Sequence, residues 1–201
     1  SLDPHWFSTM WGVYMFAGSI MAGFAFLALM SVLMLRSNLL TGWVNVEHLH
    51  DLGKLMYGFT IFWTYIAFSQ YFLIWYSNIP EETMWYAHRQ GSWETLGFVL
   101  MIGHFVLPFL LLMPRTIKRN PVTLAVGAAW MLVMHFADLY YIVMPGSPEG
   151  HHGFHPAVSD FLIWIGLVAF FVAILALAMK RSKLVPVGDP RLGESLAHVN
   201  F

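Results

Sequence analysis

The chain has 201 residues, of which 58% are hydrophobic and 10% charged, and its formal net charge is -1 at pH 7. This composition lies outside that of soluble domains and indicates an integral membrane protein. The near-zero net charge excludes the basic surplus of a nucleic-acid-binding protein. The absence of cysteine excludes iron–sulfur ligation, c-type haem attachment and thiolate zinc sites within this chain.

Five apolar stretches are each long enough for a membrane-spanning helix, because a hydrocarbon core of about 30 Å takes roughly 20 residues of helix. The expected spans are residues 6–35, 55–76, 95–113, 122–144 and 159–179. The connections are short, without a linker that would divide the chain. We therefore expect an all-α, polytopic transmembrane bundle over residues 1–183. Residues 184–201 follow as an extended tail, in which Pro186 and Pro190 prevent a continuing helix.

With these spans, every lysine and arginine except Arg89 falls on one side of the membrane. The residues on that side are Arg36, Lys54, Arg115, Lys118, Arg119, Lys180, Arg181, Lys183 and Arg191. Because basic residues are enriched in cytoplasmic loops, this predicts a cytoplasmic carboxy terminus and an amino terminus outside. The chain opens at Ser1 without a signal-peptide pattern, so we expect it to be the carboxy-terminal part of a longer chain; a processed or truncated chain would look the same.

The second span opens with the stretch EHLHDLGKLMYG, residues 47–58, which places charged side chains at the start of an apolar helix. If the helical phase holds, polar side chains form a stripe within an arc of about 120° that continues into the span. The stripe consists of Glu47, His50, Asp51, Lys54, Tyr57, Tyr65 and Ser69. An amphipathic helix end with a snorkelling lysine explains the first part of the stripe, but it explains Tyr65 and Ser69 poorly.

Three ionisable residues lie inside the third and fourth spans, where an unpaired charge is costly. His104 is near the middle of the third span, and His135 and Asp138 share one face of the fourth because they are three residues apart. Intramembrane ionisable residues commonly mark ion or proton pathways; the alternative is that each one only hydrogen-bonds a neighbouring helix. The aspartate beside a histidine favours the functional interpretation.

Two loops are expected on the outer side. Residues 79–94 combine Pro80, acidic residues and aromatic residues, which is typical of a short helix in the membrane interface. Residues 145–158 hold His151, His152 and His155. Three close histidines raise the possibility of a metal site, but the glycines and prolines between them impose no converging geometry, so we favour a solvated or partner-contacting loop over a metal site.

Three stretches of sequence carry a family resemblance. WTYIAFSQYFLIWYSNIPEET (residues 63–83), LHDLGKLMYGF (49–59) and VGDPRLGESL (187–196) resemble the larger quinone-associated membrane subunit of bacterial alternative complex III, a quinol:cytochrome c oxidoreductase. The resemblance covers essentially the whole chain, as the carboxy-terminal half of that subunit. A polar motif embedded in an aromatic span is more specific than hydrophobicity alone.

The resemblance implies a four-helix-bundle protein of the NrfD and polysulfide-reductase anchor family in the bacterial inner membrane. The implied partners are a sister NrfD-like membrane subunit, an iron–sulfur subunit, multihaem cytochrome c subunits, a terminal oxidase and lipid. Haem c and iron–sulfur clusters would reside in those partners, and menaquinone or another quinone would act at the level of the complex. This chain itself would bind no cofactor or metal and hold no catalytic residue.

With that family in view, we expect a non-redox subunit that contributes a proton path and part of a quinone-proximal surface. The candidate path residues are Glu47, His50, Asp51, Lys54, Tyr57, Tyr65, Ser69, His104, His135 and Asp138. Two alternatives remain open. His104 and His135 lie at comparable depths and could hold a b-type haem, or the polar residues only lock helices together in a structural anchor.

Overall fold

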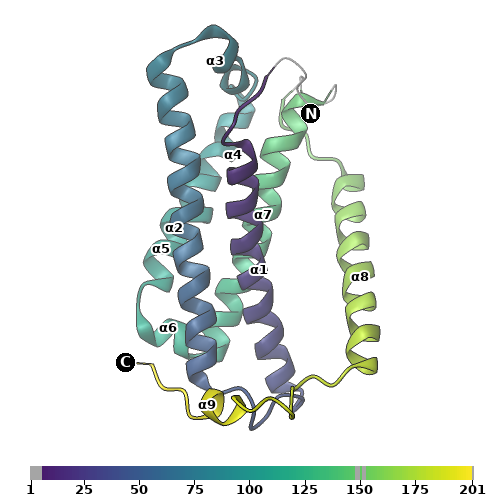
Figure 1. The fold of residues 1–201 in the computed structure, drawn as a ribbon. Helices are drawn as coiled ribbons and strands as arrows, with labels where there is room; N and C mark the ends of the chain where they lie inside the picture. The colour runs from purple at the N-terminus through teal and green to yellow at the C-terminus, as the bar shows by residue number, and fades with distance from the viewer. Residues whose placement is uncertain (1–5, 148–149, 151–152, 201) are drawn as a thin grey trace.

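The computed structural model describes residues 6–147, 150 and 153–200, and every regular element in that part of the chain is a helix. The expected all-α class is therefore confirmed. The chain runs up and down through the bundle and then returns along its lower end (Figure 1). The elements are α1 (Trp11–Arg36), α2 (Val46–Ser77), α3 (Pro80–Ala87), α4 (Ser92–Leu100), the π-helix η1 (Met101–Val106), α5 (Leu107–Leu112), α6 (Arg115–Arg119), α7 (Pro121–Val143), the 3-10 helix η2 (Met144–Gly146), α8 (Val158–Arg181) and α9 (Leu192–Leu196).

Four helical segments among the described residues are long and apolar enough to cross a membrane, which indicates a multi-pass membrane protein. They are Trp11–Arg36, Ser92–Leu112, Pro121–Gly146 and Val158–Arg181. The prediction of five spans is not confirmed, because α2 is not one of these four. Its tyrosines, threonines, serine and glutamine lower its mean hydropathy, although it extends over 32 residues beside α1.

Side-chain caps fix the start of α2 and α7. The Asn45 side chain accepts hydrogen bonds from the backbone N–H groups of Glu47 and His48, at 2.9 and 3.1 Å, and the His48 ring accepts one from the Asn45 N–H. This capping box places the charged residues of the EHLHDLGK stretch in the first turns of α2. Asn120 caps α7 in the same way through Val122.

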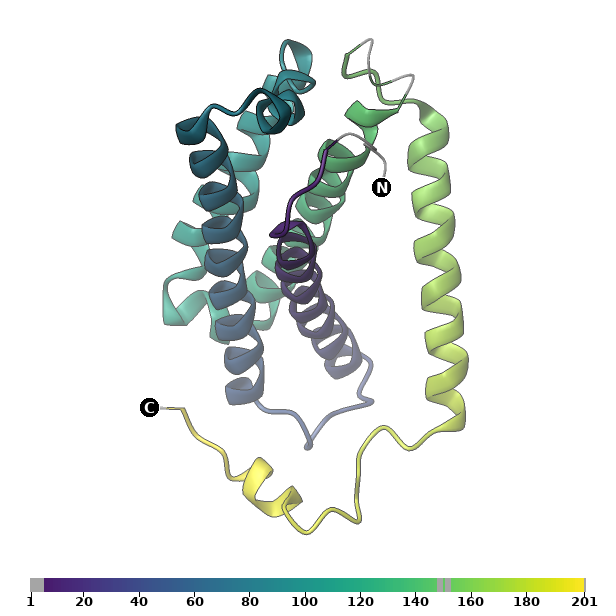
Figure 2. The same ribbon diagram turned by 45° about the horizontal axis from the view of Figure 1, so that its top comes forward.

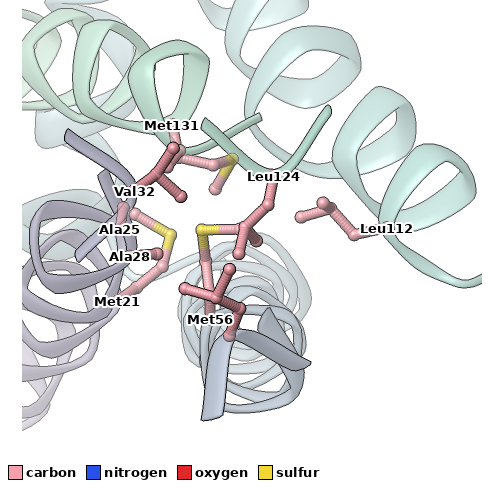
Figure 3. Packing of buried hydrophobic residues seen from close by; sticks show 10 residues of the cluster. Met21, Ala25, Ala28, Val32, Met56, Leu112, Leu124 and Met131 are labelled. Atoms are coloured by element: carbon pink, nitrogen blue, oxygen red, sulfur yellow. The ribbon is translucent and has the colours of Figure 1, made fainter. Parts of the chain in front are cut away.

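The apolar core lies where α1, α2, α5 and α7 meet. Its buried side chains on α1 are mostly small or flexible, and they pack against methionines and leucines of the other helices (Figure 3). The members are Met21, Ala25, Ala28, Val32, Leu49, Met56, Leu112, Leu124, Ala128 and Met131. The alanines allow α1 to approach α7 closely, as small residues do in membrane helix pairs.

Helix α8 stands apart from the other helices (Figures 1 and 2). None of its residues is buried. Its contacts are aromatic pairs, such as Phe136 with Trp164 at 4.4 Å between ring centroids and Phe26 with Phe171 at 5.6 Å. Tyr140 of α7 also donates a hydrogen bond to the carboxylate of Asp160, at 2.9 Å.

The last turns of α1 and α8 and the short helix α6 lie at the lower end of the bundle in Figure 1, and we call this the basic end. These segments carry Arg36, Arg115, Lys118, Arg119 and Lys180. The tail crosses this end and returns to α2 (Figure 2). The sequence predicts an extended tail, and the structure adds one short helix to it, α9. Pro186 and Pro190 lie between α8 and α9, where proline, which has no N–H group, disfavours a continuing helix.

Candidate functional site

Five polar or aromatic side chains from four helical segments meet inside the bundle, and we call them the buried polar cluster. They are Tyr14 of α1, Trp63 of α2, His104 of η1, and His135 and Asp138 of α7. His104 and Asp138 are 0% and 1% exposed. The three ionisable residues that the sequence places inside the spans are thus brought together in one site.

The Asp138 carboxylate is the centre of the hydrogen bonding in this cluster. Its Oδ1 accepts a 2.6 Å hydrogen bond from the Tyr14 hydroxyl, and its Oδ2 accepts one of 3.2 Å from the indole N–H of Trp63. The ion pairs found in the described part of the chain all involve other carboxylates. Both described partners of this buried carboxyl are neutral donors, so no ion pair compensates a charge on it.

Trp63 connects the carboxylate to the histidines. Its ring centroid lies 4.0 Å from that of His104, and the rings are inclined at 50°. The His104 and His135 rings are 6.3 Å apart. Among the described residues, both ring nitrogens of His104 and Nδ1 of His135 are buried without a hydrogen-bond partner. Such atoms are costly unless they bind water or a ligand.

The π-helix η1 positions His104, and Pro108 explains why it forms. In a regular α-helix the N–H of residue 108 would bond to the carbonyl of His104, but proline has no N–H and its ring crowds that carbonyl. The backbone relaxes into a wider turn, as is common at functional sites. Within this turn, the carbonyl of the preceding residue, Gly103, accepts a 2.7 Å hydrogen bond from the indole N–H of Trp130 on α7.

Gly18 lets α1 approach the cluster. A Cβ atom at this position would lie 2.9 Å from Cε1 of His135 and 3.4 Å from Cδ1 of Trp63. Real Cβ atoms essentially never approach a neighbour as closely as 2.9 Å, so any larger residue would push the His135 ring away. The sequence signal here is only the spacing of Gly18 from Ala22, which is typical of packed membrane helices.

None of the polar residues predicted on α2 is among the members of this cluster. Tyr65 is 64% exposed and points away from the bundle core. Tyr57 is half-buried, stacks on Phe109 at 5.6 Å and lies under the Lys118 ammonium at 5.1 Å. Ser69 is also half-buried. The face of α2 that reaches the cluster is the one carrying Trp63.

Glu47, His50, Asp51 and Lys54 lie at the basic end, and the apolar core separates them from the cluster. Along α2 the buried face passes from His50 through Met56 to Trp63. Met56 is 0% exposed and packs among the core residues of α1 and α7. Any transfer between the basic end and Asp138 therefore has to cross a layer of methionine and leucine side chains.

Two ion pairs join α2 to its neighbours or to itself at the basic end. Arg119 contacts the Glu47 carboxylate at 2.6 Å, and Lys54 contacts that of Asp51 at 2.7 Å. Burial acts to raise the pKa of Glu47, but the hydrogen bonds and charge of Arg119 outweigh it, so that this pKa lies below its usual value. Burial lowers the pKa of Lys118, whose ammonium donates to the carbonyls that end α5.

A cavity of about 320 Å³ lies on the other side of the cluster, at the end opposite the basic end. Its wall includes Trp6, Trp11, Trp85 and Arg89. Trp11 stacks nearly parallel on Tyr14, at 5.7 Å between centroids. The cavity is therefore one aromatic ring away from the hydroxyl that binds Asp138.

The expected interfacial helix over residues 79–94 corresponds to α3 and the start of α4, with Trp85 buried between them and the bundle. His151 and His152 lie outside the described residues, so the three-histidine arrangement of that loop is not described. His155 is exposed.

Tyr14 and Trp63 are the site residues that sequence reasoning missed. Tyrosine and tryptophan are common at membrane interfaces, so neither residue differs in pattern from ordinary packing aromatics. Compared with known proteins, the sequence matches no protein-family model and no curated sequence. The resemblance to alternative complex III therefore stays a prediction that rests on the quoted motifs.

Proposed function

We propose that this chain is a non-redox membrane subunit of a quinol:cytochrome c oxidoreductase of the alternative complex III type, and that it carries a proton path. The observation that supports it most is the buried Asp138 carboxyl, which is held by Tyr14 and Trp63 beside two histidines with unpartnered nitrogens. Buried carboxyl and imidazole groups at membrane depth are the usual components of proton relays.

In this proposal the chain lies in the bacterial inner membrane with α2 as a fifth span. At 1.5 Å per residue, the 32 residues of α2 extend over about 48 Å, more than a hydrocarbon core requires. The basic end faces the cytoplasm, in line with the distribution of lysine and arginine. The amino terminus and the aromatic cavity then face the periplasm.

Protons enter at the basic end, where Glu47, Asp51 and Lys54 exchange them with water. They pass the apolar core, occupy the His104 and Asp138 region, and leave through the cavity beside Tyr14. Moving one charge across 100 mV costs about 2.3 kcal/mol, so a path needs a barrier that opens only with the driving reaction. The core methionines are suited to that barrier, since their flexible side chains let a dry layer rearrange.

Quinol oxidation in a neighbouring subunit would supply the driving reaction, with electrons passing to iron–sulfur and haem c groups in partners. This division of labour is consistent with the absence of cysteine from the chain. The chain would contribute to a quinone-proximal surface without holding the redox centre.

The test is Asp138→Asn in the reconstituted complex. Asparagine keeps the volume but cannot exchange a proton, so we expect quinol oxidation and assembly to persist while proton translocation per electron falls. Asp160→Asn is the matched control, because Asp160 also accepts a tyrosine hydrogen bond but lies at the start of α8. A normal proton ratio in Asp138→Asn would contradict the path and leave the polar residues as helix-locking contacts.

One observation favours a second candidate function, a b-type haem held by His104 and His135. Their ring centroids are 6.3 Å apart with the ring planes inclined at 41°, and the described residues offer the His104 ring no competing hydrogen-bond partner. An absorbance spectrum of the isolated subunit separates the candidates. A Soret band that disappears in His104→Ala would replace the proton path by a redox role.

A further inference from the structure

The end of the tail is bound to the charged surface of α2 and α6. His198 contacts the Asp51 carboxylate at 2.8 Å, and the Ser195 hydroxyl lies 3.1 Å from the His48 ring. Asn200 makes the densest set of contacts. Its side chain accepts a 2.6 Å hydrogen bond from the Lys54 ammonium and donates one of 3.1 Å to the Glu47 carbonyl, and its own carbonyl accepts one of 2.9 Å from Arg115.

These contacts involve the same side chains that the proposed path uses to take up protons. Glu47, Asp51 and Lys54 each touch the tail, and Glu47 is also held by Arg119. Residues 182–194 run beneath the bundle and connect this bound segment to the end of α8, which is visible in Figure 2.

The bound segment is held by polar contacts and buries little apolar surface. Leu196 and Val199 are 41% and 64% exposed, so its apolar side chains are in large part still accessible to solvent. Exposed ion pairs and hydrogen bonds contribute little net stability, because water replaces them readily. Such a segment detaches without unfolding the bundle.

We propose that Ser195–Asn200 is a detachable strap over the basic end that limits proton access to Glu47. With the strap bound, the Glu47 side chain is 13% exposed and that of Asp51 is 35% exposed. The gating role of the strap rests on the proposed function, whereas its attachment to α2 does not. When bound, the strap engages Glu47 through Asn200 and Asp51 through His198. When released, it leaves the Glu47 carboxylate open to water.

Attachment is measured first, with two spin labels in the assembled complex in membranes. The chain contains no cysteine, so Thr116→Cys with Ala197→Cys labels two exposed positions that make no side-chain hydrogen bond among the described contacts. We expect one narrow distance population at low salt. It should broaden at about 1 M salt, where the Debye length falls to about 3 Å.

Asn200→Ala is the variant that should release the strap, because it removes the side-chain oxygen that accepts from the Lys54 ammonium and the amide that donates to the Glu47 carbonyl. Loss of the hydrogen bond to the charged Lys54 raises the detached fraction roughly tenfold. Val199→Ser, at an exposed neighbouring position, should leave the distance unchanged. Proton uptake from the cytoplasmic side should be faster in Asn200→Ala than in Val199→Ser, at equal quinol oxidation.

A distance that stays narrow both in Asn200→Ala and at high salt would show a fixed tail and overturn the proposal. Release of the strap without faster proton uptake would also overturn the proposal, provided that proton translocation per electron still falls in Asp138→Asn. If Asp138→Asn transports normally, the proposed function fails and the gating role fails with it, whereas the distances still decide whether the tail attaches.

Discussion

Helices α7 and α8 have nearly the same length and both are apolar enough to cross a membrane, yet only α7 is part of the packed bundle. Helix α7 has buried residues along its whole length, and α8 has none. The difference lies in what each sequence offers to neighbours. Helix α7 carries His135 and Asp138 inside its span, whereas the acidic residue of α8 is at its first turn. Hydropathy therefore identifies a span, and internal polar residues identify the face that packs.

The largest expected effect comes from removing the carboxylate that holds α7 to α1 and α2. Asp138→Ala leaves the Tyr14 hydroxyl and the Trp63 N–H buried without an acceptor, which costs roughly 2–6 kcal/mol in total at about 1–3 kcal/mol per group. Thermal unfolding in detergent measures this loss. Asp160→Ala on α8 should cost no more than about 1 kcal/mol, because its site is partly exposed. Equal losses would mean that the two helices are anchored alike.

A smaller effect is expected from Gly18→Ala. The new Cβ would meet His135 at 2.9 Å, and overpacking of this kind costs about 1–3 kcal/mol. The matched variant is Gly166→Ala on α8, where nothing lies within 4 Å of the added atom. It should be neutral or stabilise the helix by about 0.5–1 kcal/mol, since alanine is the better helix former. If Gly18→Ala is equally harmless, the close approach of α1 to His135 is not rigid.

The smallest effect concerns pH dependence at the basic end. The pKa of Glu47 is lowered in the folded protein, so its pairing with Arg119 stabilises the fold above the ordinary glutamate pKa of 4.5 and is lost as the pH falls through the lowered value. Glu47→Gln should therefore reduce the unfolding temperature slightly at neutral pH. The difference from wild type should shrink below pH 4.5.

Lys180→Gln provides the comparison on α8, because no ion pair is described for that residue. It should leave the pH profile unchanged. A Glu47→Gln difference that persists undiminished at acid pH would contradict the role of its charge.

The sequence indicated the chemistry of the site more completely than its geometry. His104, His135 and Asp138 stand out because ionisable side chains are rare in apolar spans. Tyr65 shares the polar arc of α2, but the buried face of that helix, which carries Met56 and Trp63, lies on its opposite side. Trp63 is two residues before Tyr65, which places it about 160° around the helix from Tyr65 at 100° per residue. Nothing in the local pattern of Trp63 shows that its N–H reaches a carboxylate on α7.

What the sequence determined by itself is local. It determined the helices, which follow from apolar stretches and caps, and the proline that removes the backbone hydrogen bond to the His104 carbonyl. It also determined that the basic residues gather in the loops on one side. The tertiary structure decided which helices touch, so it alone placed Tyr14 and Trp63 on Asp138, left α8 outside the packed bundle and brought the tail onto α2. The physical reason is that helix formation depends on neighbours within about four residues, whereas these contacts join residues far apart in the chain and form only when packing selects one arrangement.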